Sequence, residues 1–107
     1  MKLEKDFQRD LIAELKSMFP GSIILKNDAG YKQGIPDLLI LYGKKWASLE
    51  CKKSANATKR PNQDYYVGTM NKMSFSRIIF PENKEEVLYE LQQALKPRRK
   101  ARSSGGK

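Results

Sequence analysis

The chain has 107 residues, of which 39% are hydrophobic and 31% are charged, so we expect one small folded domain rather than a disordered chain. No apolar run approaches the roughly 18 residues that a membrane span needs, and the charged start MKLEKDFQRD is unlike a secretory signal. One cysteine and no histidine exclude an internal disulfide and remove the commonest zinc ligand. That leaves Mg²⁺ or Mn²⁺ as the natural metals for oxygen ligands.

The net charge of +9, from 21 basic and 12 acidic residues, is concentrated at the C-terminal end. The last 12 residues carry +6 with no acid among them, while the other 95 carry +3 (15 minus 12). The six basic residues are Lys96, Arg98, Arg99, Lys100, Arg102 and Lys107. We therefore expect a folded domain over 1–96 and a basic, disordered tail over 97–107. Such a tail often follows a polyanion such as nucleic acid; a tail that only aids solubility is the alternative.

Hydrophobic spacing predicts seven elements in chain order. Apolar residues at helical spacing mark amphipathic helices, and short runs rich in β-branched residues mark strands. Glycine and proline fall between the runs, where turns are expected. The expected elements are a helix over 3–19, strands over 22–26, 37–42 and 46–52, a helix over 61–73, a strand over 75–80 and a helix over 84–96.

This element order predicts an α/β domain with a central mixed four-stranded sheet and helices on both sides, because the strands read as apolar on both faces. Pro61 is expected in the first turn of the second helix, where its missing N–H costs little. Asn83 followed by Glu86 resembles a capping box at the start of the last helix.

The stretch GIPDLLILYGKKWASLECKKS, residues 34–54, predicts a hairpin that carries two acids. Carboxylates are among the residues least often buried unless they are paired or bind a metal. If Gly43 and Lys44 form a two-residue type II′ turn, Asp37 lies directly opposite Glu50 on one face. A three-residue loop would shift the register by one and place the two acids on opposite faces.

In the two-residue register, the side chain of Lys52 points to the same face as that of Glu50. Two carboxylates about 5 Å apart repel by roughly 3 kcal/mol, which protonation, a cation or a metal ion relieves. Asp37, Glu50 and the carbonyl of Cys51 would then offer three oxygen ligands, with Lys52 beside them to stabilise charge at a phosphorus. The alternative is an acid pair at the open end of the hairpin, neutralised by Lys52 and solvent. The Cys51 side chain alternates away and is expected to be buried and inert.

The Pro36-Asp37 pair and the Glu50-Cys51-Lys52 triplet together resemble the motifs of the PD-(D/E)xK nuclease superfamily. The Gly-Ile-Pro-Asp-Leu form and the short hairpin are most similar to its virus-type replication-repair nuclease (VRR-NUC) branch, and the likeness spans about residues 3–80. The restriction-endonuclease-like αβββαβ core of that family agrees with the expected element order. The segment NKMSFS, which lacks a glycine often found there, and the basic tail depart from the family pattern.

The resemblance implies a divalent-metal-dependent DNA endonuclease that hydrolyses phosphodiester bonds and leaves a 5′-phosphate. It implies that Asp37 and Glu50 bind Mg²⁺ or Mn²⁺ with help from the Cys51 carbonyl. Lys52 would position the attacking water, and Gln63, at the start of the second helix, would assist in placing water or phosphate. For Gln63 the alternative is an ordinary polar residue in a first helical turn.

The resemblance also suggests a second group of residues around this site. Glu4 matches an additional metal or water ligand of the family, with Glu14 as a competing candidate; a solvated acid favoured by the helix dipole is the alternative for Glu4. Tyr65 and Tyr66 are candidates for stacking on bases, and we expect at least one in the core. Candidate phosphate contacts, for which solvated surface residues are the alternative, are Lys53, Lys59, Arg60, Arg98, Arg99 and Lys100.

Small stand-alone domains of this kind resemble phage enzymes that act on branched DNA such as four-way (Holliday) junctions. Two symmetric cuts need two sites, so we expect a homodimer. We expect a cytoplasmic location, in a phage-infected or bacterial cell, and no membrane partner. The rival function is a non-catalytic nucleic-acid-binding module on a nuclease-like fold.

Overall fold

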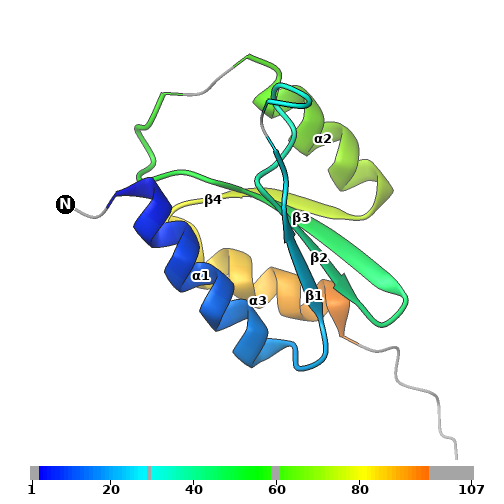
Figure 1. Ribbon diagram of the computed structural model, residues 1–107. Coiled ribbons are helices and arrows are strands. Elements are labelled where there is room, and N and C mark those ends of the chain that lie inside the picture. Colours follow the sequence, from blue (N-terminus) through cyan, green and yellow to red (C-terminus); the bar gives the residue numbers. More distant parts are fainter. Residues whose placement is uncertain (1–2, 29, 59–60, 97–107) are drawn as a thin grey trace, which may run out of the picture.

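The computed structural model describes residues 3–28, 30–58 and 61–96, and it confirms the predicted α/β class (Figure 1). Each predicted helix and strand is present, with bounds shifted by no more than two residues. None of the helices in these ranges is long and apolar enough to cross a membrane. The elements are α1 (Glu4–Met18), β1 (Ile23–Lys26), β2 (Leu38–Tyr42), β3 (Lys45–Cys51), α2 (Gln63–Met73), β4 (Phe75–Ile79), the 3₁₀ turn η1 (Pro81–Asn83) and α3 (Lys84–Leu95).

The strands form one mixed sheet in the order β1-β2-β3-β4. β1, β2 and β3 pair antiparallel, and β4 pairs parallel to β3. The parallel pair requires a crossover connection, which α2 supplies between the end of β3 and the start of β4. The N-terminal end of β2 and the C-terminal ends of β3 and β4 therefore lie together at one end of the sheet.

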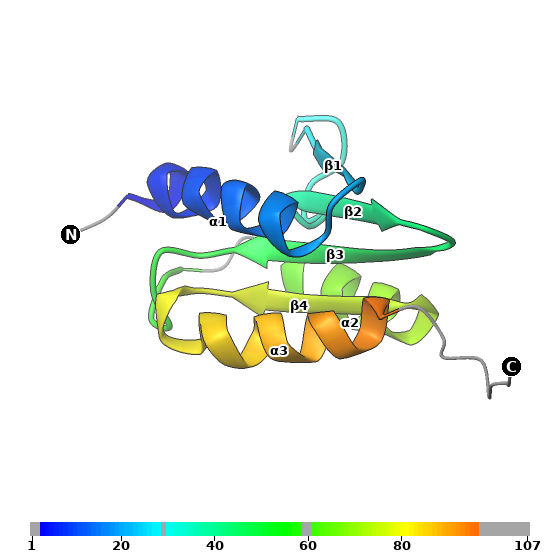
Figure 2. The ribbon, with the colours of Figure 1, turned by 90° about the horizontal axis from the view of Figure 1, so that it is seen from below.

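One face of the sheet is covered by α1 and α3, and this face holds the hydrophobic core (Figure 2). α1 buries Phe7, Leu11 and Leu15, spaced four residues apart along one stripe of the helix. The whole buried apolar cluster comprises Phe7, Leu11, Leu15, Phe19, Leu38, Ile40, Ala47, Leu49, Cys51, Phe75, Ile79, Val87, Leu88, Leu91 and Leu95. Every one of these residues comes from α1, α3, a strand or the residue after α1.

The opposite face lies under α2, which contacts β3 and β4 (Figure 2). The expectation that both faces of the strands are apolar is wrong here. Ser48 of β3 donates to Ser76 of β4 at 2.7 Å, and both are buried. Glu50 of β3 is buried on this face as well, and the one fully buried residue of α2 is Gln63. The second layer of the domain is therefore polar at its centre.

Two predictions about helix starts need correction. α2 begins at Gln63 rather than at Pro61, because Asn62 adopts a left-handed conformation (φ 71°), which asparagine tolerates better than most residues. The predicted capping box at α3 is wrong, since the Asn83 side chain makes no cap to that helix. Its amide instead accepts from the Phe80 N–H at 2.8 Å and donates to the Ile78 carbonyl at 3.0 Å, so it ties η1 to the end of β4.

Candidate metal centre

The register of the β2–β3 hairpin decides whether the two acids meet. Tyr42 pairs with Lys45 and Leu38 pairs with Leu49, so the turn is two residues long. Its first residue, Gly43, has φ 62°, a conformation that glycine adopts without strain. One further step along the ladder places Asp37 opposite Glu50. The two-residue register is confirmed, and the three-residue alternative is excluded.

Hydrogen bonds to Pro36 and Asp37 hold the chain at the start of β2. Oδ2 of Asp37 accepts the Cys51 N–H at 2.9 Å. The Asn27 N–H donates to the Asp37 carbonyl at 2.8 Å, and the Asn27 amide donates to the Pro36 carbonyl at 2.7 Å. Because the N–H and C=O of one strand residue face the same neighbouring strand, the Cys51 carbonyl lies on the Asp37 side of β3.

Glu50 is 2% exposed, and its two carboxylate oxygens differ in their surroundings. Oε2 accepts a hydrogen bond from the Gln63 amide at 2.5 Å and lies 3.7 Å from the Lys52 ammonium. Oε1 is buried, and no donor among the described residues reaches it. A buried carboxylate oxygen without a donor is costly, and it is the kind of atom that a bound ion or water satisfies.

The pKa of Glu50 is raised from 4.5 to about 7, and burial is the largest cause. The carboxylates of Asp37 and Glu4 contribute to the rise, while the Lys52 ammonium and a backbone hydrogen bond from Asp37 oppose it. Since desolvation and like charge outweigh the single lysine, Glu50 is only partly ionised near neutral pH. A divalent cation would reverse this balance, because it favours the ionised carboxylate.

Lys52 follows β3 directly and is buried beside Glu50. Its N–H donates to the Ile79 carbonyl at 2.9 Å, which continues the parallel ladder by one residue and fixes the backbone. Its ammonium donates to the Thr58 carbonyl at 3.2 Å. A lysine is rarely buried unless it is paired. Lys52 therefore belongs to the centre and is not an ordinary surface charge.

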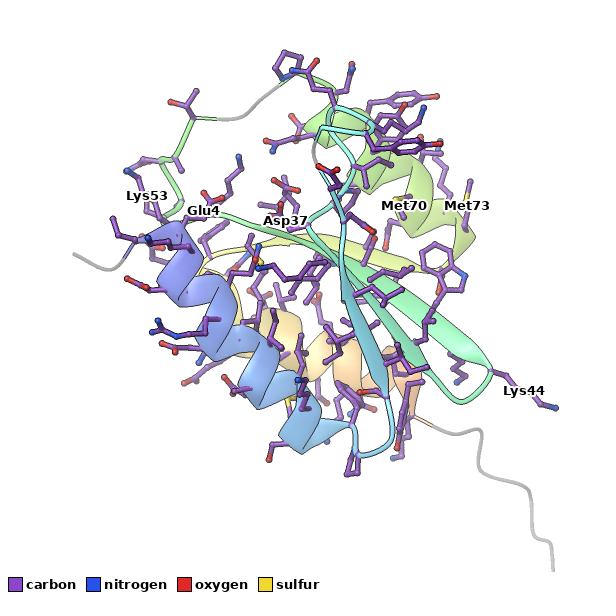
Figure 3. All side chains as sticks on the ribbon, in the orientation of Figure 1. Glu4, Asp37, Lys44, Lys53, Met70 and Met73 are labelled. Atoms are coloured by element: carbon purple, nitrogen blue, oxygen red, sulfur yellow. The ribbon has the colours of Figure 1, made fainter. Side chains whose placement is uncertain are left out.

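The structure separates the two candidate acids of α1. Glu4 is the first residue of the helix and lies near enough to raise the pKa of both Glu50 and Cys51. Glu14 instead forms an ion pair with Lys84 of α3 at 2.9 Å. Figure 3 shows Glu4 and Asp37 at the same end of the molecule. Within the described part of the chain, no three acidic or cysteine side chains are grouped closely enough to hold a metal ion.

The donors present fit a hard divalent cation. Two carboxylates, one with an unsatisfied buried oxygen, and a main-chain carbonyl on the same side of β3 are the oxygen ligands that Mg²⁺ and Mn²⁺ prefer. Mg²⁺ commonly uses only one or two carboxylates and keeps several waters, so a third acidic ligand is not required. The Cys51 thiol takes no part, because its side chain is buried in the core and burial raises its pKa well above the usual range.

Other predicted contact residues are less closely placed. Lys53 is exposed and lies at the same end of the molecule as Glu4 and Asp37 (Figure 3). Tyr65 is exposed and Tyr66 is half-buried, so neither is a core residue, contrary to the expectation that at least one would be. The predicted contacts Lys59, Arg60, Arg98, Arg99 and Lys100 lie outside the described residues, as does the tail over 97–107.

Sequence reasoning missed two residues that hold the centre together. Asn27 fixes the backbone on both sides of the Pro36–Asp37 bond, and Thr58 provides the carbonyl that holds Lys52. Both belong to polar segments that read only as loops. The signal that was available is the asparagine at the end of β1, since asparagine side chains commonly bond to nearby backbone groups in turns.

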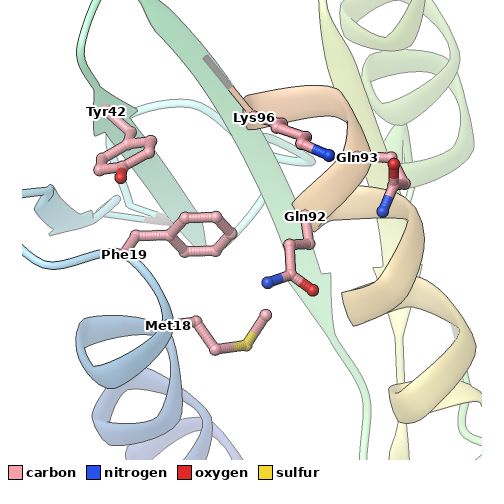
Figure 4. Close-up of a pocket in the computed structure, with 6 residues that line it drawn as sticks. All are labelled: Met18, Phe19, Tyr42, Gln92, Gln93 and Lys96. Atoms are coloured by element: carbon pink, nitrogen blue, oxygen red, sulfur yellow. The ribbon is translucent and has the colours of Figure 1, made fainter. Parts of the chain in front are cut away.

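A pocket of about 290 Å³ lies at the far end of the sheet, near the last residue of β2 (Figure 4). Because β2 begins next to Asp37 and ends at this pocket, the two places are separated by the length of the strand. No carboxylate lines it among the described residues, which sets it apart from the candidate centre. It is lined by Met18, Phe19, Tyr42, Gln92, Gln93 and Lys96.

Comparison with known proteins found no matching family model, no matching curated protein and no matching solved structure.

Proposed function

We propose that the protein is a divalent-metal-dependent DNA endonuclease of the PD-(D/E)xK kind. The observation that carries the proposal is the buried Glu50 oxygen Oε1, which has no hydrogen-bond donor among the described residues. It belongs to the acid whose pKa the Asp37 carboxylate of the neighbouring strand end raises. Lys52 is buried on the same side. Two acids and a lysine around an unsatisfied oxygen are what a phosphodiester hydrolase without histidine requires.

Asp37, Glu50 and the Cys51 carbonyl are the proposed ligands of Mg²⁺ or Mn²⁺, and Glu4 is a further candidate nearby. When bound, such an ion lowers the pKa of a water molecule and neutralises charge on a phosphate oxygen. The Gln63 amide donates to Oε2 of Glu50, so Oε1 would be the oxygen that binds the ion. Gln63 is therefore proposed as a positioning residue.

Lys52 supplies the one positive charge of the chain that lies against the acid pair within the described residues. Its ammonium is fixed between the Thr58 carbonyl and Glu50 Oε2, at 3.2 and 3.7 Å. In this place it orients a water molecule for attack and stabilises the negative charge that builds up at the phosphorus. A fixed charge in a water-excluded site stabilises the transition state more than a charge in solvent does, because it needs no reorganisation during the reaction.

The proposed substrate is DNA, and branched DNA such as a four-way junction is the preferred form. The net charge of +9 supports a polyanionic partner, and the exposed Lys53 lies at the end of the molecule that carries the centre (Figure 3). A chain of 107 residues offers little surface for reading base sequence, which favours recognition of DNA shape. The expected products carry a 5′-phosphate.

The proposal includes a homodimer, which would place two centres on one junction. The edge strand β1 is the surface proposed for it, because its outer backbone groups face no other strand of the sheet. Ile23 and Leu25 on this strand are both exposed, and an exposed apolar edge favours association. Light scattering should report a dimer for the wild-type chain and a monomer for Leu25→Glu; a wild-type monomer at all accessible concentrations would contradict this part.

The function is tested by a cleavage assay on junction, flap, single-stranded and blunt duplex DNA, with Mg²⁺, with Mn²⁺ and with EDTA. We expect cleavage of at least one branched substrate with either metal and none with EDTA. Asp37→Asn and Glu50→Gln should each reduce the rate at least about a hundred-fold, while DNA binding is kept or tightened because a negative charge facing phosphate is removed.

Glu14→Gln is the matched control, since Glu14 is an acid of α1 that pairs with Lys84 away from the centre. It should cleave at the wild-type rate. If the purified protein binds these DNAs but cuts none of them with either metal, the non-catalytic nucleic-acid-binding function is the better account. Equal rates for wild type and Glu50→Gln would refute the assignment of the centre.

A further inference from the structure

Two exposed tyrosines, one half-buried tyrosine and a lysine form an aromatic surface next to Gln63 of the candidate metal centre. We call Tyr31, Lys32, Tyr65 and Tyr66 the tyrosine surface. Tyr31 is 88% exposed and Tyr65 is 65% exposed. The rings of Tyr65 and Tyr66 meet edge to face with centroids 5.1 Å apart, and the Lys32 ammonium lies 5.8 Å from the centre of the Tyr66 ring. The β1–β2 loop and the first turn of α2 thus converge on one place.

The loop between β1 and β2, which carries Tyr31, lies next to α2 (Figure 1). Gly34 has φ 93°, and a Cβ added there would lie 2.6 Å from Cβ of Asn62, the residue before Gln63. The loop ends at Asp37, whose backbone is fixed by Asn27. The tyrosine surface is therefore connected on one side to Asp37 and on the other, through Gln63, to Glu50.

Packing in the fold does not explain why the rings of Tyr31 and Tyr65 are exposed. Asp28 closes a turn by accepting the Gly30 N–H at 2.8 Å and, through its carbonyl, the Tyr31 N–H at 3.0 Å, so the turn presents the Tyr31 ring outward. The β1–β2 loop and the first turn of α2 carry three acids, Asp28, Asp37 and Asp64, and one lysine, Lys32. Flat aromatic faces rather than local charge are thus what distinguishes this surface.

We propose that the tyrosine surface stacks on unpaired bases of the DNA strand whose phosphate occupies the metal centre. This inference rests on the proposed nuclease function and narrows its substrate class. In a continuous duplex the base faces are covered by their neighbours, whereas at a flap, a junction centre or a single-stranded extension they are free to stack on aromatic rings. The preferred substrate is DNA with unpaired nucleotides next to the bond that is cut.

The test compares binding of two fluorescent DNAs in EDTA, so that no cleavage is needed: a blunt duplex and the same duplex with a single-stranded extension. Wild type should bind the extended duplex more tightly. The double variant Tyr31→Ala with Tyr65→Ala should lose about ten-fold or more of its affinity for the extended duplex, and little for the blunt one. The double variant to phenylalanine should keep the preference, because the rings remain.

Tyr89→Ala is the matched control, because Tyr89 is also 65% exposed but lies on α3, across the sheet from α2. It should bind both DNAs as wild type does. An equal loss on both DNAs in the alanine double variant, no loss on either, or no DNA binding by wild type would each overturn the stacking proposal. Cleavage with Mg²⁺ but no change in preference overturns this inference alone. If the protein prefers the extended duplex but cleaves no DNA, the nuclease function alone is overturned and the stacking proposal is supported.

Discussion

The two faces of β3 are buried to a similar extent but have different roles. Ala47, Leu49 and Cys51 point into the core under α1 and α3, while Ser48 and Glu50 point to the α2 side, and all five are buried. On the first face, burial of apolar surface stabilises the fold. On the second, each buried polar group costs free energy unless a partner satisfies it. Neighbouring residues on one strand thus separate the part that stabilises the domain from the part proposed to act on DNA.

The largest expected difference comes from Leu49 and Glu50, which are adjacent in sequence and opposite in face. Leu49→Ala should lower the free energy of unfolding by about 2–5 kcal/mol, because it leaves a cavity in the core. At low temperature the folded fraction should still cleave DNA. Glu50→Gln should abolish cleavage without lowering stability at pH 8, since it removes a buried charge. Urea unfolding and cleavage assays on both variants measure this; a loss of stability in Glu50→Gln like that of Leu49→Ala would show that the second face is also a stabilising one.

The next effect is a pH dependence that belongs to the polar face alone. The pKa of Glu50 is raised from 4.5 to about 7, so between these values the folded state binds a proton that the unfolded state releases. The free energy of unfolding should therefore fall as pH rises through this window, by up to about 3 kcal/mol. Glu50→Gln should remove this slope, and Leu49→Ala should keep it. A slope that is the same in wild type and Glu50→Gln would contradict the raised pKa.

A smaller effect is expected at Gln63, which donates a hydrogen bond to Oε2 of Glu50. Gln63→Leu keeps the size of the side chain but loses the hydrogen bond to Oε2. We expect Mn²⁺ affinity to fall about ten- to a hundred-fold, as for other residues that orient a metal ligand. Calorimetric titration with Mn²⁺ measures this. Unchanged affinity would mean that Glu50 is held well enough by its strand and by Lys52.

The apolar face was predictable from sequence to a greater degree than the polar face. Turn chemistry at Gly43 offered a two-residue turn as one of two possible registers, and only that register places Asp37 and Glu50 on one face; the structure has the two-residue turn. A count of apolar residues along a strand does not reveal that Ser48 pairs with Ser76 under α2, because that contact joins two strands through the fold. For this reason the expectation of two apolar faces was wrong.

Local sequence patterns also could not predict the contacts that support the centre. The burial of Lys52 depends on the carbonyl of Thr58, which the chain brings back from a polar segment with no periodicity. The choice between Glu4 and Glu14 depended on how α1 lies across the sheet, since both are acids on the same helix. The helix places Glu4 near Glu50, whereas Glu14 forms an ion pair with Lys84.

The central claim is that Asp37 and Glu50 together hold a divalent cation. Electron paramagnetic resonance of free Mn²⁺ during a titration measures this directly, without DNA or turnover. The account predicts saturable binding by wild type and by Glu14→Gln, affinity that rises with pH through about 7 as Glu50 loses its proton, and loss of binding in both Asp37→Asn and Glu50→Gln. Wild-type protein that binds no Mn²⁺, or Glu50→Gln that binds it as tightly as wild type, would contradict the claim.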